Sequence, residues 1–316
     1  MLIYFTIILW YNRLVVDFHP KGRINMKKIV ILGCENSHAD IFLGIMKDNP
    51  KYKDVECIGV YSHEDEPMRA LQEKYGVKAM SSYDEAACSA DGVIITARHG
   101  DNHYKYAKPY IKRGVPMFID KPVTISESDA LRLIAECREC GARLTGGSSL
   151  IHEDIVRELR ADAMSGFDGA TLSGFVRCPL SLSSPNGGFY FYAEHLVGIV
   201  TSIFGYYPRS VMALDKDGRI TVIFRYDGYD ITGLYLDNNY SSYYAMRVSE
   251  TRNKGGEFTV SGDSPCFERE LSEFYSLLSG EDMPRSYEEI ISPVFIMNAI
   301  ERSLKSGKEE CVSVVS

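Results

Sequence analysis

Between residue 26 and about residue 144, short apolar runs alternate with amphipathic stretches. This alternation is typical of βαβ units, which build a parallel sheet with helices on its faces. The predicted strands are Lys28–Leu32, Val55–Tyr61, Gly92–Thr96 and Pro116–Ile119. The predicted helices are Ser37–Asp48, Glu66–Tyr75, Asn102–Arg113 and Ser126–Cys140. Because the carboxyl ends of parallel strands share one edge of the sheet, we expect a dinucleotide cofactor to bind along that edge.

The pattern changes after the glycine-rich passage Thr145–Ser148. Strands separated by short turns, such as residues 215–218, indicate a largely antiparallel sheet. They are predicted at Thr171–Cys178, Val211–Leu214, Ile220–Tyr226, Ile231–Leu236, Tyr243–Ser249 and Glu257–Ser261, with helices at Tyr190–Phe204, Glu268–Leu278 and Tyr287–Lys305. The predicted fold class is α/β: an N-terminal Rossmann domain with a doubly wound parallel sheet, then a C-terminal α+β domain with a large, mostly antiparallel open sheet. We place the domains at residues 26–145 and 146–316, with the C-terminal helix packing back on the first.

Residues 1–25 contain one apolar run, Leu2–Trp10. About nine apolar residues are too few to span a bilayer, which needs roughly 20. No basic region precedes the run and no small-residue cleavage pattern follows it, which argues against a signal peptide. We therefore predict a non-structural extension, with a membrane tether or a packing arm as alternatives.

Charge and cysteine content exclude several classes of function. The net charge is −8 and no cluster of Lys and Arg stands out, so we expect no nucleic-acid partner. Eight scattered cysteines favour reduced thiols in the cytoplasm over a disulfide framework. Cys137 and Cys140 form a CxxC within a helical pattern and without a second ligand pair, so we interpret them as structural thiols and predict no metal site.

The first strand-to-helix turn has the sequence Gly-Cys-Glu-Asn-Ser-His at residues 33–38. It has the first glycine of the G-x-G-x-x-G fingerprint but not the other two, so an ordinary capped turn stays an alternative to a cofactor loop. Asn36 and Ser37 can cap the following helix, whose free amides attract a diphosphate. The residues of this turn predicted to contact a cofactor are Gly33, Glu35, Asn36, Ser37 and His38.

The end of the second strand bears on the choice between NAD and NADP. Ser62 can hydrogen-bond a ribose hydroxyl there, and His63 could partly accommodate a 2′-phosphate. The three acids at residues 64–66 would repel that phosphate. We therefore favour NAD(H), with NADP(H) possible.

Two further segments make the pattern specific. Residues 96–103 follow the third strand, and Asp120-Lys121-Pro122 closes the fourth. Together with the helix ending at residues 111–115 and the later segment from Gly187-Gly188 to His195, they resemble the glucose-fructose oxidoreductase/inositol dehydrogenase (Gfo/Idh/MocA) family. The resemblance extends from about Met26 to Val312. It implies an NAD(P)-dependent enzyme that oxidises a secondary alcohol of a carbohydrate-like small molecule, with no membrane partner, and a homodimer or homotetramer formed through the C-terminal sheet.

The resemblance also assigns roles to residues. Lys121 matches the lysine that stands beside nicotinamide and substrate, with Asp120 in place of the usual Glu, and His195 matches the histidine that exchanges the hydroxyl proton. A lysine can polarise an oxygen, and a neutral imidazole can accept its proton. The other predicted cofactor contacts are Ser62, His63, Thr96, Arg98, His99, His103, Asp120 and Lys121. The predicted substrate contacts are Lys121, Tyr190, Tyr192 and His195.

Two positions depart from the family pattern. The frequent aspartates four residues before and three residues after the histidine are Phe191 and Gly198 here. Either the acid–base set is reorganised around Tyr190, Tyr192 or Glu194, or the chemistry has changed. The alternatives are a lyase or glycosidase-type reaction through transient oxidation by tightly held NAD, and a non-catalytic nucleotide or sugar sensor.

Overall fold

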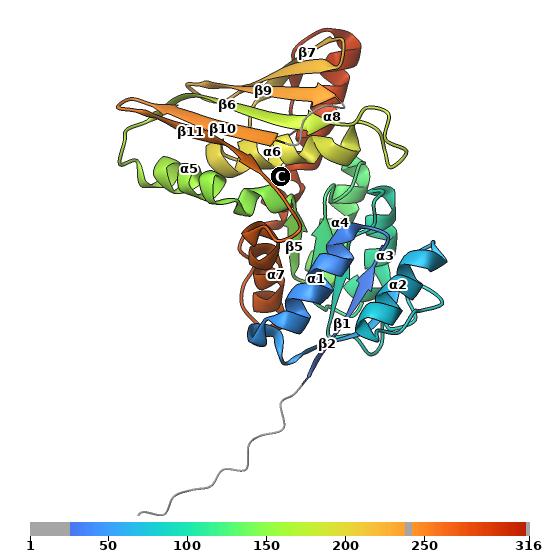
Figure 1. Cartoon of the computed structure of the whole chain (residues 1–316). Coiled ribbons are helices and arrows are strands. Elements are labelled where there is room, and N and C mark those ends of the chain that lie inside the picture. Colours follow the sequence, from blue (N-terminus) through green and yellow to red (C-terminus); the bar gives the residue numbers. More distant parts are fainter. Residues whose placement is uncertain (1–25, 238–241, 314–316) are drawn as a thin grey trace, which may run out of the picture.

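The computed structural model describes residues 26–237 and 242–313, which form two sheets stacked along the long axis of the molecule (Figure 1). The apolar run Leu2–Trp10 lies outside the described residues. Within them, no helix is both long and apolar enough to cross a membrane.

The first sheet is parallel and has the strand order β2-β1-β3-β4-β5. Its strands are β1 (Lys27–Leu32), β2 (Val55–Tyr61), β3 (Gly92–Ile95), β4 (Met117–Asp120) and β5 (Leu144–Gly147). The four predicted strands are confirmed, and the order places β1 and β3 at the centre. The carboxyl ends of these two strands therefore lie side by side at the edge where α1 begins.

The fifth strand was not predicted. The sequence indicates a glycine-rich passage at Thr145–Ser148, yet Leu144–Gly147 pairs with β4, and the boundary expected between residues 145 and 146 falls inside this strand. Gly146 has φ +133°, and a Cβ at this position would lie 1.9 Å from the carbonyl oxygen of Ile119. Glycine is therefore required at position 146 because the two strands approach each other closely. In the sequence alone, the same glycine is typical of a linker.

Helices cover both faces of the parallel sheet. They are α1 (Ser37–Asp48), α2 (Asp65–Tyr75), α3 (Asp101–Ile111) and α4 (Glu127–Cys140), followed much later in the chain by α7 (Pro265–Leu278). Alternate residues of β1 face different cores: Ile29 and Ile31 pack with Phe42 and with Phe274 of α7, whereas Val30 packs on the opposite face. A helix from the C-terminal half therefore completes the N-terminal core.

The second sheet has seven strands in the order β11-β10-β6-β9-β8-β7-β12. They are β6 (Thr171–Leu180), β7 (Ser210–Lys216), β8 (Arg219–Arg225), β9 (Asp230–Asp237), β10 (Ser242–Ser249), β11 (Asn253–Thr259) and β12 (Glu310–Cys311). Only the β6/β9 pair is parallel, which confirms the predicted fold class. β11 begins earlier than predicted because Gly255 and Gly256, which lower strand propensity, lie within its ladder.

Three helices connect this sheet to the parallel one: α5 (Asp154–Ser165), α6 (Tyr190–Phe204) and α8 (Tyr287–Ser306). Helix α5 was not predicted. Two short 3₁₀ turns, η1 (Pro50–Tyr52) and η2 (Ser149–His152), lie elsewhere in the chain. α6 is buried from Ala193 onward and packs against β6 and β9. In α8, the Asn298 amide donates to the Ile125 carbonyl at 3.1 Å, and the Tyr287 hydroxyl donates to the Ala142 carbonyl at 2.8 Å.

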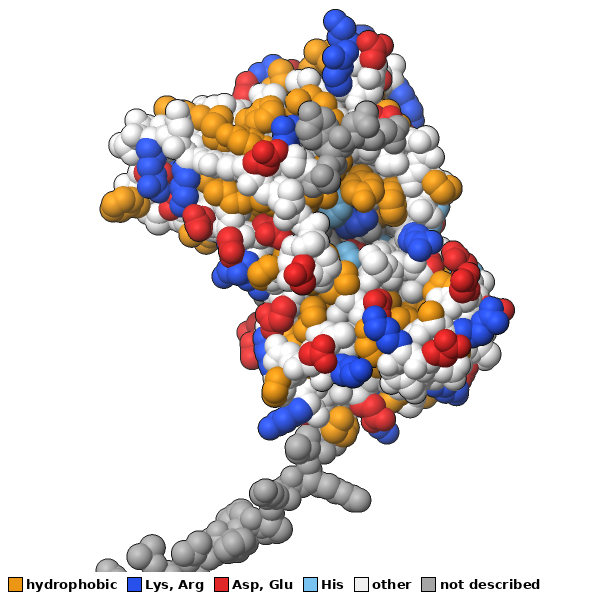
Figure 2. All heavy atoms as spheres, in the orientation of Figure 1, with side chains coloured by type: hydrophobic (Ala, Val, Ile, Leu, Met, Phe, Trp, Pro, Cys, Tyr) orange, Lys and Arg blue, Asp and Glu red, His pale blue; other side chains and the backbone are white. Residues whose placement is uncertain are grey.

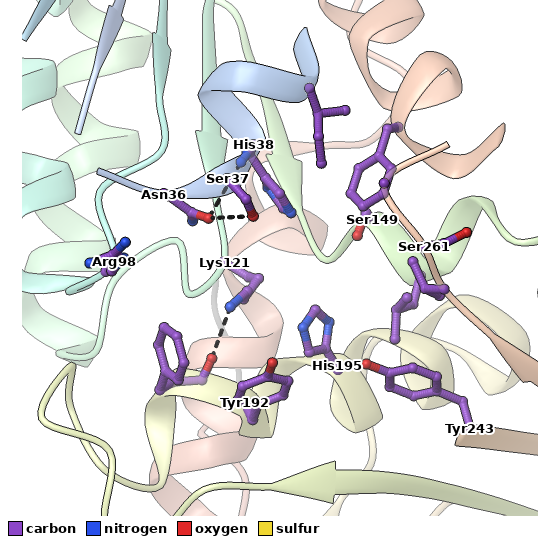
Figure 3. A pocket seen from close by; sticks show the side chains of 16 residues that line it. Asn36, Ser37, His38, Arg98, Lys121, Ser149, Tyr192, His195, Tyr243 and Ser261 are labelled. Carbon is purple, nitrogen blue, oxygen red and sulfur yellow. Dashed lines mark hydrogen bonds between the residues drawn. The ribbon is translucent and has the colours of Figure 1, made fainter. Parts of the chain in front are cut away.

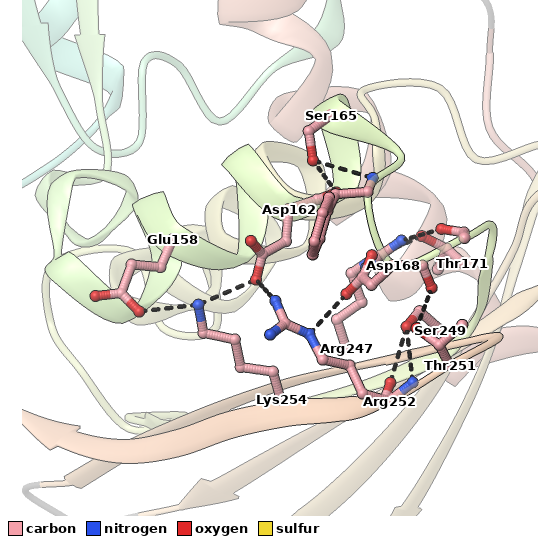
Figure 4. A network of polar contacts seen from close by, with 12 residues as sticks. Glu158, Asp162, Ser165, Asp168, Thr171, Arg247, Ser249, Thr251, Arg252 and Lys254 are labelled. Carbon is pink, nitrogen blue, oxygen red and sulfur yellow. Dashed lines mark hydrogen bonds and ion pairs between the residues drawn. The ribbon is translucent and has the colours of Figure 1, made fainter.

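An ion-pair network fastens α5 to β10 and β11 (Figure 4). Arg247 is 2% exposed, and its guanidinium bonds Asp168 Oδ1 at 2.6 Å, Thr171 Oγ1 at 2.8 Å and the Gly169 carbonyl at 2.9 Å. Arg252 Nε bonds the other oxygen of Asp168 at 3.1 Å. The pKa of Asp168 is lowered to about 2, and the hydrogen bond from Arg247 makes the largest contribution to that shift.

We expect Arg247→Met to lower the free energy of unfolding by about 3 kcal/mol, because Asp168 then loses its buried partner. Urea denaturation measures the change. Lys254→Met is the matched control: Lys254 pairs with Asp162 at 3.0 Å in the same network but is more exposed, so its loss should cost less than about 1 kcal/mol. Equal losses of unfolding free energy in the two variants would show that the burial of Arg247 does not make its ion pair more important than that of Lys254.

Candidate active site

A cavity of about 490 Å³ opens between the carboxyl edge of the parallel sheet and α6. Figure 2 shows this hollow between the two halves of the molecule, with histidine side chains and a Lys or Arg side chain inside it. Figure 3 shows Lys121 from the parallel half of the molecule facing Tyr192, His195 and Tyr243 from the other half. It is lined by Asn36, Ser37, His38, Ile41, Arg98, Lys121, Ser149, Leu150, Phe191, Tyr192, His195, Tyr243, Val260, Ser261, Gly262 and Phe267.

Lys121 enters the cavity directly after β4, so the parallel sheet fixes its backbone. Its Nζ donates to the Phe191 carbonyl at 3.1 Å and lies 4.4 Å from the centre of the Phe191 ring and 5.2 Å from that of Tyr192. Burial lowers the pKa of Lys121, and the charges of Asp120 and Glu194 partly oppose that shift. The ammonium is therefore held by a carbonyl and two aromatic faces, with no carboxylate within 4.0 Å among the described residues.

Asp120 is fully buried and joins β4 to the first turn of α1. One oxygen lies 2.8 Å from His38 Nδ1 and accepts from Asn36 Nδ2 at 3.1 Å, while the other accepts from the Lys121 backbone amide at 2.7 Å. Burial alone would raise the pKa of Asp120, but His38 and Lys121 outweigh it and lower that pKa. Asp120 does not itself line the cavity; it holds His38, Asn36 and Lys121, which do.

His195 reaches the cavity from α6. Its Nδ1 lies 2.8 Å from Ser148 Oγ, and its ring packs 5.4 Å from that of Tyr192. Burial and the nearby Lys121 ammonium lower the pKa of His195 well below the usual imidazole value, so the ring is neutral at pH 7. A Cβ at Gly198 would lie 3.1 Å from Ser148 Cβ. The departure at Gly198 thus makes room for the serine that orients His195.

The loop between β1 and α1 fits a dinucleotide cofactor. Gly33 has φ +80°, and a Cβ there would lie 2.2 Å from the backbone of Ala97, so only glycine lets these strand ends approach. Asn36 caps α1 by accepting from the His38 amide at 3.4 Å. The positive end of this 12-residue helix and the guanidinium of Arg98 both adjoin the cavity and suit a diphosphate.

Glu35 stands where the fingerprint has its second glycine. Its carboxylate accepts from Ser62 Oγ at 2.8 Å and from the Arg98 backbone amide at 3.1 Å. The ends of β1, β2 and β3 are thereby linked through one acidic side chain. Glu35 and Ser62 were both predicted to contact the cofactor, and the structure shows that they also bond each other.

Several predicted cofactor contacts lie outside the cavity. Thr96 donates to the Gly33 carbonyl at 3.1 Å and supports the loop from beneath. The buried His103 has its ring nitrogens 2.8 Å from the Ala97 carbonyl and 2.7 Å from that of Pro122, so it ties the β3 and β4 loops together. His63 contacts the Tyr61 hydroxyl at 3.3 Å, and His99 lies 3.8 Å from Asp101.

The predicted substrate contacts divide in the same way. Tyr192 lines the cavity beside Lys121 and His195. Tyr190 does not: its hydroxyl donates to Asn298 and Glu301 of α8, each at 3.2 Å. One turn of α6 therefore presents Tyr192 to the cavity and Tyr190 to the helix packed behind it.

Other residues of the site were missed in the sequence. Ser149 follows β5, Tyr243 comes from β10 and Ser261 follows β11, and all three line the cavity. Ser148 does not line it but contacts His195 Nδ1. No motif marks these four residues, because only the tertiary fold brings them to the site. Glu194 is also placed here: it accepts from the Val123 amide at 3.2 Å, and burial raises its pKa to about 8.

Comparisons with known proteins agree with this architecture. Residues 27–148 match the Gfo/Idh/MocA family model, described as an oxidoreductase family with an NAD-binding Rossmann fold. GenD2 from gentamicin A biosynthesis, solved with NAD, has a TM-score of 0.80 at 14% identity, over 92% of this chain and 97% of that one. Myo-inositol 2-dehydrogenase from Lactobacillus plantarum has a TM-score of 0.79 at 12% identity, over 91% and 100%.

A third solved structure, myo-inositol dehydrogenase from Corynebacterium glutamicum, has a TM-score of 0.77 at 14% identity, over 92% of this chain and 100% of that one. No curated protein sequence matches the chain. At these identities the superpositions establish the two-sheet fold, while the family model covers the parallel half. The chain therefore carries the NAD-binding Rossmann domain of the Gfo/Idh/MocA oxidoreductase family.

Proposed function

We propose that the protein reversibly oxidises a secondary alcohol of a sugar, polyol or sugar derivative with a nicotinamide cofactor. The observation that carries the proposal is the meeting of two side chains from different parts of the chain. Lys121 follows a strand of the parallel sheet and His195 lies on α6, yet both line one cavity beside the N-terminus of α1. Dehydrogenases of polyols share this fold, as the two myo-inositol enzymes indicate.

A bound nicotinamide would supply the acceptor for the hydride of the carbinol carbon. Lys121 donates a hydrogen bond to the substrate oxygen and stabilises the negative charge that develops on it. His195 takes the hydroxyl proton, since the tautomer that donates Nδ1–H to Ser148 Oγ leaves Nε2 with a free lone pair. The aromatic faces of Phe191 and Tyr192 keep water from the Lys121 ammonium.

NADH accumulation tests the proposal. Purified protein is mixed with NAD⁺ and a panel of sugars, polyols and their derivatives, and NADH absorbance is followed. We expect stoichiometric NADH from at least one compound. Turnover of a compound without free NADH would instead indicate transient oxidation, and binding of NAD⁺ and sugars with no turnover at all would indicate a sensor.

Glu35 should set the preference for NAD(H) over NADP(H). A 2′-phosphate next to Ser62 would approach the Glu35 carboxylate, which Ser62 already contacts at 2.8 Å. Two unit charges 8 Å apart interact by about 2 kcal/mol at an effective dielectric of 20, so NAD(H) should bind at least about tenfold more tightly. Glu35→Gln should reduce the ratio of NADH affinity to NADPH affinity about tenfold, as measured by fluorescence titrations with the two cofactors. Glu73→Gln, on the exposed side of α2, is the control and should leave the ratio unchanged.

The outer face of the second sheet supports self-association. Met246, Phe175, Thr232 and Ile223 stand opposite one another on four neighbouring strands, and all are half-buried on the face turned away from the helices. A homodimer or homotetramer formed through this face would cover them. Thr232→Lys should yield monomers in light scattering after gel filtration, whereas Leu131→Lys on α4 should not. A monomeric wild type would contradict the proposal.

The cysteines support a reducing compartment, and we place the protein in the cytoplasm on that basis. All eight lie among the described residues and are free thiols. Burial raises the pKa of Cys137 to about 12, so this half of the CxxC pair stays protonated, while Cys140 is exposed. The pair therefore behaves as two ordinary helix residues.

A further inference from the structure

We propose that the substrate carries a carboxylate close to the hydroxyl that is oxidised, so that the natural substrate is a hydroxy acid of the sugar-acid type. This inference rests on the proposed function and narrows its substrate class. It follows from the balance of donors and acceptors around the cavity and from the surroundings of Lys121.

The first observation is the chemistry of the cavity wall. Among the residues that the structure describes, none that lines the cavity is acidic, whereas the wall includes Lys121, Arg98 and the imidazoles of His38 and His195. The hydroxyls of Tyr192 and Tyr243 also face the cavity and make no hydrogen bond within the described part of the chain. A neutral polyol brings a donor with every hydroxyl and needs acceptors on the protein, whereas a carboxylate only accepts. The wall therefore suits a ligand rich in acceptors.

The second observation is the ammonium of Lys121. It has three donors, and its one hydrogen bond to the described residues goes to the Phe191 carbonyl. The adjacent Asp120 carboxylate is already occupied by His38, Asn36 and the Lys121 backbone amide. A buried cation without an ion-pair partner is costly. A hydroxy acid would satisfy both remaining donors, one with the oxygen that is oxidised and one with an oxygen of the neighbouring carboxylate.

Phe191 explains why the protein does not supply this charge itself. Its ring covers the Lys121 ammonium at 4.4 Å, in a position from which a shorter acidic side chain would contact Nζ directly. Arg98 does not take that role, because its side chain is 43% exposed and lies 3.9 Å from Glu64. A carboxylate fits better than a phosphate, because Lys121 supplies the one ammonium among the described lining residues and a dianionic phosphate would keep part of its charge uncompensated.

Calorimetry with matched ligands tests the inference. Aldonic acids and the alditols of the same chain length and configuration, D-gluconate and D-glucitol among them, are titrated into the NADH-loaded wild-type protein, with glucose 6-phosphate as a third arm. We expect at least one acid to bind at least about tenfold more tightly than its alditol. Equal or tighter alditol binding, no binding of any acid, or tighter binding of the phosphate would overturn the assignment.

Phe191→Asp and Phe191→Asn form the decisive pair of variants. The aspartate would occupy the Lys121 ammonium and repel a second carboxylate, so it should reduce the acid-to-alditol preference at least about tenfold. The asparagine, of the same size but neutral, should retain that preference. Parallel assays of NAD⁺ reduction distinguish the proposed carboxylate of the substrate from the proposed oxidoreductase activity. Reduction by alditols but not by acids would overturn the carboxylate alone, and absence of reduction by every compound would contradict the proposed oxidoreductase.

Discussion

Lys121→Ala should lower kcat/KM for the alcohol substrate at least about a hundredfold, the scale for losing one positioned polar group in an active site. The ammonium is the inner-cavity donor that can stabilise charge on the reacting oxygen, and its pKa is lowered by burial. The fold should survive, because truncation removes a buried charge whose one hydrogen bond within the described part of the chain goes to the Phe191 carbonyl.

Steady-state kinetics and thermal unfolding measure these two effects separately. Lys112→Ala, on the exposed end of α3, is the control and should keep full activity. Turnover in Lys121→Ala that equals the wild-type rate would remove Lys121 from the chemistry. Unchanged turnover with weaker acid binding would instead assign it to the substrate carboxylate alone.

His195→Asn should also lower turnover at least about a hundredfold, because the amide cannot accept the hydroxyl proton. The ring is flanked by Lys121, Asp120 and His38, and burial with the Lys121 charge lowers its pKa. Only the neutral imidazole can accept a proton, so oxidation should slow as the pH falls through that lowered pKa. The acidic limb of the wild-type profile should therefore lie below pH 6.5, the usual imidazole value.

Initial rates of oxidation between pH 5 and pH 9 show this limb. Ser148→Ala is the informative companion, because it removes the 2.8 Å contact to Nδ1 but keeps the base. It should lower kcat moderately and leave the acidic limb in place. A His195→Asn variant with the wild-type limb would show that another group accepts the proton.

Much of the parallel half was predictable because its signals are local. Apolar runs such as Val55–Tyr61, and helices with their own caps, are specified by residues that are neighbours in the sequence. Strand β5 was missed for the opposite reason. Its two glycines carry no strand propensity, and the need for Gly146 comes from the Ile119 carbonyl on the neighbouring strand.

The candidate site shows the same division. Lys121 and His195 were assigned through the resemblance to a known family, which depends on short motifs around each of them. Tyr190 and Tyr192 are two residues apart on α6, and the sequence could not tell which of them faces the cavity. Packing of Tyr190 against α8 decided it.

By itself, the sequence determined the order of most strands and helices, the edge of the parallel sheet beside which the candidate site lies, and the two residues, Lys121 and His195, that are proposed to perform the chemistry. These features follow from the periodic spacing of hydrophobic residues and from the positions at which strands end, and both are specified by residues that are neighbours in the sequence. Only the tertiary structure decided that Asp120 supports His38 instead of lining the cavity, that Gly198 makes room for Ser148, and that Tyr243 joins the wall. Each depends on contact between segments far apart in the chain, where space and charge are set by partners that no local pattern identifies.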